Sequence, residues 1–408
     1  MTTRLSRDQA LRALFPLDAP LHRGDNRCVS DTASSPRRVL GFWPALALVV
    51  GNLIGSGIYL LPATLAPLGA NALIGWGVTI FGAMALAFVF ARLAAKLPCA
   101  GGPYAFADAA FGPVVGFAVA WSYWILVWAG NGALAIAVVS ALGVPFPALA
   151  GGAPAFVTAL VLIWGLVAVN IRGVALAGRI QLVTALLKLA PLAAIILVAL
   201  WLLLRDGQSA IAVNQPVPIS AGAIAGAVAL TFWGFLGVES ATVPADKVKD
   251  AARIVPLVTM LGTALAGMVY VLVAGAIALM MPADLIAASP APLAAFLGRS
   301  WGAGAQLIVA VFAAISALGT LNGFILLQGE MPWAMARGGV FPACAYRSDL
   351  RPYRRASIGG ARCCGGRRGR GPSGAAERLC RGELRATDRR PRAAGDVDRI
   401  LGAGDRAG

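Results

Sequence analysis

The sequence predicts an all-α protein that crosses a membrane several times. Of its 408 residues, 59% are hydrophobic and only 13% are charged, which is more apolar sequence than a soluble core requires. The hydrophobic residues form runs long enough to cross a bilayer, which takes roughly 20 helical residues per crossing. Two of these runs contain glycine-bearing interruptions. Together these observations indicate a polytopic membrane protein built from helices, two of them broken.

Eight apolar runs are expected to form the membrane spans. Lysine and arginine follow the second, fourth, sixth and eighth runs, whereas the alternate loops contain only Arg299 as a base. Because basic loops stay on the cytoplasmic side, the N-terminus is predicted to be cytoplasmic. The expected spans are residues 43–67, 70–93, 114–142, 154–170, 182–204, 221–243, 254–281 and 305–331.

Polar segments flank this predicted core of residues 41–342. Residues 1–40 lack a short apolar stretch with a cleavage site, so we expect a cytoplasmic tail in which His22 is solvated. Residues 343–408 are rich in arginine, contain no lysine and have no membrane-length run. We interpret them as a disordered tail produced by a reading-frame shift near Ala343. A basic regulatory or nucleic-acid-binding tail is the alternative.

The first run contains Gly51-Asn52-Leu53-Ile54-Gly55-Ser56-Gly57. Each glycine costs a helix about 1 kcal/mol relative to alanine. Within a bilayer, non-helical backbone persists only where protein covers it or it lines a cavity. Exposed amides of Gly55, Ser56 and Gly57 would suit a carboxylate, assisted by the positive end of a half-helix. Close helix packing is the alternative explanation for these glycines.

The sixth run contains a second interruption, Thr231-Phe232-Trp233-Gly234-Phe235-Leu236-Gly237-Val238-Glu239-Ser240. Interrupted helices at matching positions of two five-span halves are typical of an inverted-repeat transporter with a midplane site. Carbonyl groups near Leu53, Trp233 and Leu236 would suit an ammonium group. A solute with both a carboxylate and an ammonium group is an α-amino acid.

Several further side chains are candidates, each with a structural alternative. Glu239 is expected to serve gating or coupling, or else to be a hydrated carboxylate near a helix end. The amide of Asn131 could bind a substrate side chain or join two helices. Lys188 could snorkel inward or act as an ammonium group that titrates with a coupling proton. Trp233 and Phe324 could cover a substrate side chain or simply pack.

The sequence offers nothing for covalent chemistry. It contains no paired carboxylates, cysteine–histidine set or phosphate-binding loop in a plausible context, and no cysteine spacing typical of a metal site. We therefore expect no enzyme activity, no cofactor, no metal and no nucleic-acid partner. The expected partners are a small solute and the lipid bilayer. A transporter-derived sensor or a non-functional remnant is the alternative class.

Six segments carry a family resemblance between residues 42 and 342. They are GNLIGSGIYLLPATLA, GWGVTIFGAMALAF, AGGPYAFADAAFGP, YWILVWAGN, TFWGFLGVESA and VKDAARIVP. The chain resembles the amino acid–polyamine–organocation (APC) superfamily, and within it the basic amino acid/polyamine antiporters typified by bacterial arginine:agmatine exchange. The resemblance implies five-plus-five inverted repeats in a bacterial inner membrane, often as a homodimer, with alternating access and exchange of arginine for agmatine.

The resemblance also implies roles for individual residues. Leu53 and Ser56 would bind the amino and carboxylate ends of the substrate, and Tyr123 with Glu239 would form a gate on the cytoplasmic side. The side-chain pocket would be lined by Leu126, Val127, Asn131, Trp233 and Leu236.

Three departures from the family pattern are visible. Phe324 occupies a position that is typically tryptophan in the arginine antiporters, which leaves lysine, ornithine, a diamine or a neutral amino acid open as substrate. Lys188 replaces a usually apolar residue and resembles proton-coupled members of the superfamily. Family members continue through spans nine to twelve, so this chain is expected to be truncated after about eight spans and to be unstable or inactive.

Overall fold

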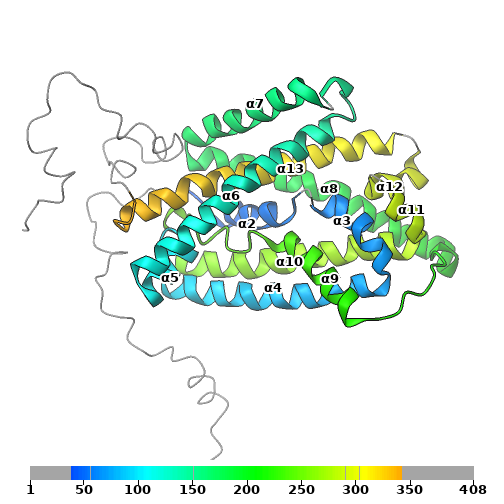
Figure 1. The fold of residues 1–408 in the computed structure, drawn as a ribbon, viewed down its shortest axis with the longest axis horizontal. Helices are drawn as coiled ribbons and strands as arrows, with labels where there is room; N and C mark the ends of the chain where they lie inside the picture. The colour runs from blue at the N-terminus through cyan, green and yellow to red at the C-terminus, as the bar shows by residue number, and fades with distance from the viewer. Residues whose placement is uncertain (1–37, 56, 150, 290, 303, 342–408) are drawn as a thin grey trace, which may run out of the picture. The chain divides into compact units, whose positions relative to one another are not determined.

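The computed structural model describes residues 38–55, 57–149, 151–289, 291–302 and 304–341. The predicted tails, apart from residues 38–40, and Ser56 lie outside the described residues. Within these residues the structure is helical, with one isolated parallel bridge between Leu40 and Val248 (Figure 1). This confirms the all-α prediction for the part of the chain that the structure describes.

Six of the predicted spans form long helices. Within the described residues these are the helices long and apolar enough to cross a membrane. They are α4 (Ala70–Lys96), α6 (Pro113–Leu142), α7 (Gly152–Ile171), α8 (Val174–Asp206), α10 (Ala251–Met280) and α13 (Ala305–Arg337). Helix α8 begins eight residues before its predicted span, and the polar Gln181 side chain in this extension is buried and hydrogen-bonded.

The two remaining runs are the interrupted ones. Residues 43–67 divide into α2 (Phe42–Leu53) and α3 (Gly57–Leu65), so the predicted interruption is present. The sixth run departs from the prediction. Helix α9 (Ala221–Phe232) and the short 3-10 turn η4 (Trp233–Phe235) are followed by turns rather than by a second half-helix. Gly237 lies at this departure from helical backbone. Its φ is +108°, which glycine adopts readily because it has no Cβ atom.

Three short helices occupy segments that were predicted to be loops. These are α5 (Pro103–Phe111), α11 (Ala283–Ala288) and α12 (Pro292–Trp301). Helices α5 and α12 begin with proline, which is favoured at the first helical position because its missing N–H needs no partner there.

Helix α2 lies at the centre of the bundle. It packs against α8, α10 and α13, while α4 packs against α9 and α10, and α6 packs against α13. Figure 1 shows α2 and α3 following one another between the α6–α13 pair and the α10–α4 pair. The first interruption therefore lies inside the helical bundle, where non-helical backbone can be covered by protein.

Small residues allow α4 and α9 to approach closely. A Cβ atom added at Gly75 would overlap Ala227, and the Thr79 and Thr231 hydroxyl groups lie 2.7 Å apart in a buried hydrogen bond. The Ser220 hydroxyl accepts a hydrogen bond from the Ala223 N–H and caps the start of α9. These contacts fix the half-helix that precedes the second interruption.

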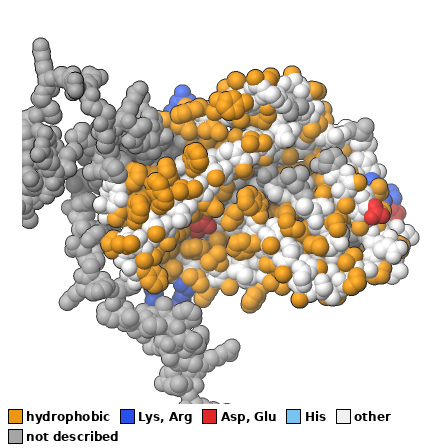
Figure 2. Space-filling model, viewed as in Figure 1, with side chains coloured by type: hydrophobic (Ala, Val, Ile, Leu, Met, Phe, Trp, Pro, Cys, Tyr) orange, Lys and Arg blue, Asp and Glu red, His pale blue; other side chains and the backbone are white. Residues whose placement is uncertain are grey.

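The exterior of the bundle is apolar. Figure 2 shows hydrophobic side chains across much of the visible face, with charged side chains near its margins and an acidic group within it. Large hydrophobic side chains such as Phe81 and Leu204 are more than three-quarters exposed. A surface of this kind suits hydrocarbon rather than water, since soluble proteins rarely expose wide apolar patches.

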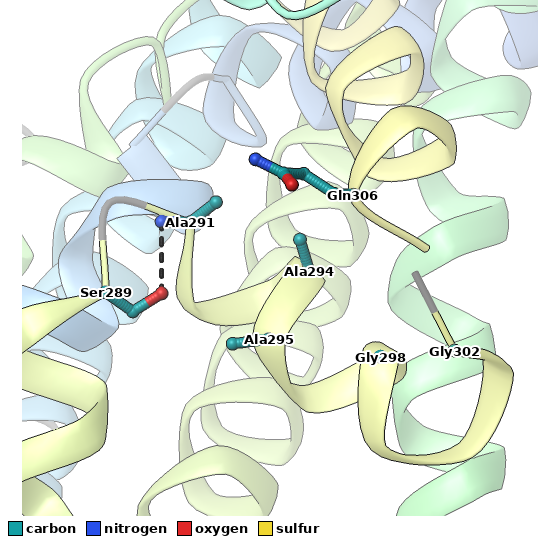
Figure 3. Close-up of a pocket in the computed structure, with 7 residues that line it drawn as sticks. All are labelled: Ser289, Ala291, Ala294, Ala295, Gly298, Gly302 and Gln306. Carbon is teal, nitrogen blue, oxygen red and sulfur yellow. Dashed lines mark hydrogen bonds between the residues drawn. The ribbon is translucent and has the colours of Figure 1, made fainter. Parts of the chain in front are cut away.

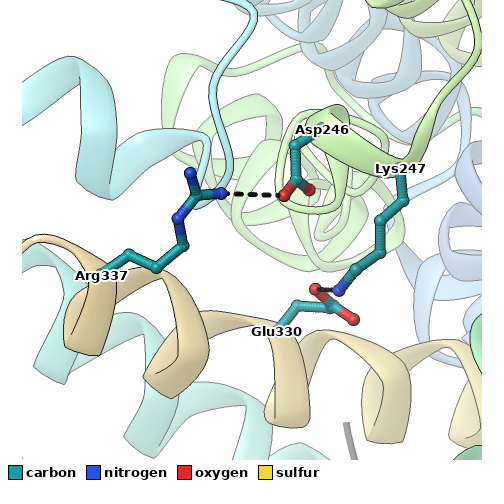
Figure 4. A network of polar contacts seen from close by, with 4 residues as sticks. All are labelled: Asp246, Lys247, Glu330 and Arg337. Carbon is teal, nitrogen blue, oxygen red and sulfur yellow. Dashed lines mark hydrogen bonds and ion pairs between the residues drawn. The ribbon is translucent and has the colours of Figure 1, made fainter. Parts of the chain in front are cut away.

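Two ion pairs connect the segment after the second interruption with the end of α13 (Figure 4). Lys247 pairs with Glu330, and Arg337 lies 3.4 Å from the Asp246 carboxylate. Both cations also lie over the ring of Trp333, at 4.3 Å and 5.0 Å. Burial raises the pKa of Asp246 above its ordinary value, and the charges of Lys247 and Arg337 oppose that shift.

The same segment also holds the start of the described chain. The N–H groups of Val39 and Leu40 donate to the Lys247 carbonyl, and the Lys249 N–H donates to the Leu40 carbonyl. The residues just before α2 are therefore hydrogen-bonded to the segment that contains Asp246 and Lys247. The side chains of Asp246 and Lys247 in turn pair with α13.

Replacing Glu330 with Gln is expected to destabilise the protein by about 3–5 kcal/mol, because Lys247 would remain buried without a compensating charge. Thermal unfolding in detergent measures the change. Asp206→Asn is the matched control, since the Arg205–Asp206 pair is exposed and its loss should leave the melting temperature nearly unchanged. Equal losses for the two variants would contradict this assignment.

Candidate functional site

The first interruption frees the carbonyl groups at the C-terminal end of α2. The Ile54 N–H makes the last helical hydrogen bond, to Val50 O at 2.8 Å, and the Gly55 N–H turns back to Leu53 O at 2.9 Å. The last carbonyl groups of any helix lack partners within it. Inside a bilayer these groups must be satisfied by other parts of the protein.

Lys188 supplies most of the missing hydrogen bonds. Its Nζ atom donates to Gly51 O and Ile54 O, both at 2.8 Å, and contacts Thr320 Oγ1 at 3.1 Å. The Lys188 side chain is fully buried. A cation at the C-terminal end of a helix is stabilised by the helix dipole as well as by hydrogen bonds. Lys188 therefore points inward to the interruption.

Two hydroxyl groups of α13 also bond the carbonyl groups of the first interruption. Thr320 Oγ1 lies 2.9 Å from Gly51 O, and Ser316 Oγ lies 3.3–3.4 Å from Gly55 O and Ile54 O. The backbone of the interruption is thus held by side chains from α8 and α13. An ammonium group and two hydroxyl groups here replace the backbone N–H groups of a continuous helix.

Tyr270 of α10 joins the two interruptions directly. Its hydroxyl oxygen lies 2.5 Å from Leu53 O and 3.0 Å from Gly234 O. Its ring stacks on Trp76, with centroids 4.9 Å apart, and meets the edge of Phe235. The two breaks are therefore neighbours in space, and a single buried phenol is shared between them.

Predicted side chains also meet across the interruptions. Tyr123 of α6 donates to Glu239 Oε1 at 2.8 Å, so the proposed gate pair is in contact. Gly57, at the start of α3, faces Trp233, because a Cβ atom built there would lie 3.5 Å from the indole. Leu236 is the first residue after η4.

The residues predicted to line the side-chain pocket differ in exposure. Val127 of α6 is buried. The ring of Phe324, which belongs to α13, lies close to Gly130 of α6. The Oδ1 atom of Asn131 is buried and has no hydrogen-bond partner among the described residues. In contrast, Leu126 and Trp233 are 47% and 60% exposed.

Other hollows lie elsewhere. One is a shallow groove along α6, lined by Val114, Val115, Ala118, Val119, Ser122, Tyr123 and Leu126. Another lies between α12 and the start of α13 (Figure 3). Gln306, the Ser289 hydroxyl and the Ala291 N–H provide its polar groups, and none of the described residues that line it belongs to either interruption.

Sequence reasoning missed several residues of this arrangement. Tyr270 and Gln181 were not singled out, although each is a polar residue in or beside an otherwise apolar run. Thr320 and Ser316 were likewise not proposed as site residues. A polar side chain within a membrane span was the available signal, since such residues generally face the protein interior.

The fold and the site define a multi-pass membrane protein with two broken segments meeting in the bundle interior. The chain belongs to the amino acid permease family, whose model, described as "Amino acid permease", matches residues 40–359. The family resemblance noted in the sequence is confirmed at this level.

Individual relatives are antiporters. The cadaverine/lysine antiporter of Escherichia coli is 37% identical over 308 residues, covering 76% of this chain and 69% of that protein. The arginine/ornithine antiporter of Pseudomonas aeruginosa is 36% identical, covering 74% and 64%. A putative arginine/ornithine antiporter of Bacillus subtilis is 29% identical, covering 74% and 70%. These relatives are transporters and not enzymes, as was predicted for this chain.

Replacing Tyr270 with Phe is expected to destabilise the protein by about 1–3 kcal/mol, because buried carbonyl groups on both interruptions lose a donor. Thermal unfolding of the purified chain measures this. Thr259→Val on the same helix is the control, since the buried Thr259 hydroxyl has no partner among the described residues. A Tyr270→Phe protein as stable as the Thr259→Val protein would show that the shared phenol does not hold the breaks.

Proposed function

We propose that this chain is a secondary transporter that exchanges a basic amino acid for an amine or a second basic amino acid by alternating access. The observation that carries the proposal is the meeting of two interrupted segments at Tyr270 within a bundle that matches the amino acid permease family. Such breaks offer main-chain groups to a charged solute without exposing them to lipid.

The proposed substrate site uses the groups identified at the interruptions. Gly55, Ser56 and Gly57 would receive the carboxylate, although Ser56 is outside the described residues. The ammonium group would bind main-chain oxygens near Leu53, Trp233 and Leu236. Of these, Leu53 O already accepts hydrogen bonds from the Tyr270 hydroxyl and the Gly55 N–H, so an ammonium group that binds there would replace one of these two donors.

The side chain of the substrate would extend towards α6. The Asn131 oxygen has no partner among the described residues and is able to accept a hydrogen bond. It therefore favours a substrate group that donates one, such as a guanidinium or ammonium group. Leu126, Val127 and Trp233 would provide apolar walls, and Phe324 would cover the far end. This chemistry supports a cationic substrate, and the names of the relatives point to lysine, arginine, ornithine and cadaverine as the first compounds to test.

Tyr123 and Glu239 would act as the gate on the cytoplasmic side. Their hydrogen bond joins α6 to the turns that follow η4. Opening towards the cytoplasm would require this contact to separate. We further propose the five-plus-five inverted-repeat arrangement, a bacterial inner-membrane location, a cytoplasmic N-terminus and a homodimer, following the family resemblance and the distribution of basic loops.

Exchange is tested with the full chain in proteoliposomes loaded with cadaverine, ornithine, agmatine, lysine or no solute. Labelled lysine and arginine are offered outside. Uptake should be several-fold faster into vesicles that contain a matching basic solute than into empty ones. Equal uptake into loaded and empty vesicles would reject exchange, and arginine uptake stimulated by agmatine alone would identify the arginine/agmatine pair.

A second candidate function is proton-coupled uptake, and the position of Lys188 favours it. Its ammonium group holds the first interruption through Gly51 O and Ile54 O, so loss of a proton would remove one of the bonds that keep the break in place. Proton binding and the geometry of the substrate site would then be linked.

This second function predicts that an inward proton gradient accelerates uptake and that Lys188→Met removes this dependence. Lys249→Met is the control, because the Lys249 side chain is exposed and outside the helices. Counterflow at equal pH on both sides checks that the Lys188→Met protein still transports. Uptake by the unaltered chain that is insensitive to the gradient would exclude proton coupling and leave exchange unaffected.

A further inference from the structure

A chain of buried amide side chains runs across the protein interior to the interruptions. Asn170 donates to Asn322 Oδ1 at 3.2 Å, and Asn322 donates to Gln181 Oε1 at 3.0 Å. Gln181 donates to Asn52 Oδ1 at 3.3 Å, and Asn52 donates to Ser240 Oγ at 2.9 Å. All five residues are at most 3% exposed. We call this set the amide chain.

The amide chain joins elements that are distant in sequence. It begins in α7, passes through α13 and α8, enters α2 one residue before its end, and finishes in the turns after η4. Each of the three asparagines and the glutamine donates towards the interruptions, so the hydrogen bonds all run in the same direction. Such aligned bonds polarise one another and strengthen the series in a low-dielectric interior.

Glycines in three elements make room for the amide chain. A Cβ atom at Gly51 would overlap the Gln181 amide, and one at Gly323 would overlap the Asn52 amide. At Gly237 it would lie 3.1 Å from Asn52 Cβ and 3.2 Å from Ser240 Oγ. Close approach of this kind is possible only without a side chain. The glycines and the amides therefore form one packed unit around Asn52.

The amides also have main-chain partners. Asn322 Nδ2 lies 3.1 Å from Ala177 O, Gln181 Nε2 lies 3.4 Å from Ala47 O, and Asn170 Nδ2 lies 2.9 Å from Leu166 O. A buried amide is costly unless it is hydrogen-bonded. Displacing one side chain of the amide chain would therefore leave its neighbours without a hydrogen-bond partner. The positions of these side chains depend on one another for this reason.

We infer that Asn170, Asn322 and Gln181 are positioning residues for substrate binding. They fix Asn52 and Ser240, and through these two the first interruption is held in register with the second. None of the three belongs to the groups proposed to bind the substrate, so their effect on affinity is exerted through Asn52. The inference rests on the proposed function, because it assigns them to the same substrate site.

Helix packing without an effect on binding is the competing explanation, and a matched pair of variants separates the two. Asn322→Leu interrupts the amide chain at its middle. Asn71→Leu is the control, because Asn71 is equally buried and bonds Leu68 O and Pro218 O without contacting the amide chain. Both variants are expected to lower the melting temperature of the full chain in detergent.

The decisive measurement is the melting temperature of each variant over a series of lysine and arginine concentrations. Asn322→Leu should raise the apparent Kd about tenfold, whereas Asn71→Leu should leave it within about twofold of the unaltered chain. Equal Kd values for the two variants would overturn the inference. If neither amino acid shifts the melting temperature of the unaltered chain, the choice of lysine and arginine as substrates is wrong. The positioning role is then decided by the same series with the solute that the exchange assay identifies.

A second pair of variants covers the case in which Asn322→Leu does not fold. Gly323→Ala deletes no hydrogen-bonding group but presses on the Asn52 amide, and should weaken binding in the same direction. Gly275→Ala in α10 is its control, since a Cβ atom there meets nothing within 4 Å. Unchanged affinity in a stably folded Gly323→Ala protein would also count against the inference.

Discussion

The structure depends on one constraint: a helix broken inside the bundle leaves carbonyl groups that lipid cannot satisfy. At the end of α2 these groups are held by Lys188, Thr320 and Tyr270. The partners come from α8, α13 and α10, the three helices that surround α2. The central position of α2 is therefore a requirement of the break, because only a helix enclosed on several sides can find this many polar partners.

A second consequence is that polar residues are concentrated around the breaks. Lys188, the amide chain and the hydroxyl groups of α13 are almost fully buried, while large apolar side chains cover the outside. These buried polar groups are tolerable because they have partners. The Asn131 oxygen, like the Thr259 hydroxyl, has no hydrogen-bond partner among the described residues, and it lies where the substrate side chain is proposed to extend. An open acceptor at that position is consistent with a ligand that brings its own donor.

The ion pairs at the end of α13 act on a different part of the molecule. Asp246 and Lys247 follow the second break directly, and their partners Arg337 and Glu330 lie on the last turns of α13 (Figure 4). The same segment holds Val39 and Leu40 just before α2. The residues before the first broken segment and after the second are thus attached to the end of α13. The breaks themselves are joined by Tyr270. Movement of α13 relative to α2 would be transmitted to both breaks together.

The sequence by itself determined the all-α membrane class, six of the eight predicted spans as long helices, and the location of the first break, because these follow from local apolar length and glycine content. It also paired Tyr123 with Glu239 through the family resemblance. Only the tertiary structure decided that residues after η4 form turns, that Lys188 bonds Gly51 O and Ile54 O, and which buried partners Tyr270, Gln181 and Asn322 meet. Those outcomes depend on contacts between residues more than 100 positions apart, as in the Gln181–Asn322 bond, and no local pattern encodes which distant carbonyl or amide a buried polar side chain will meet.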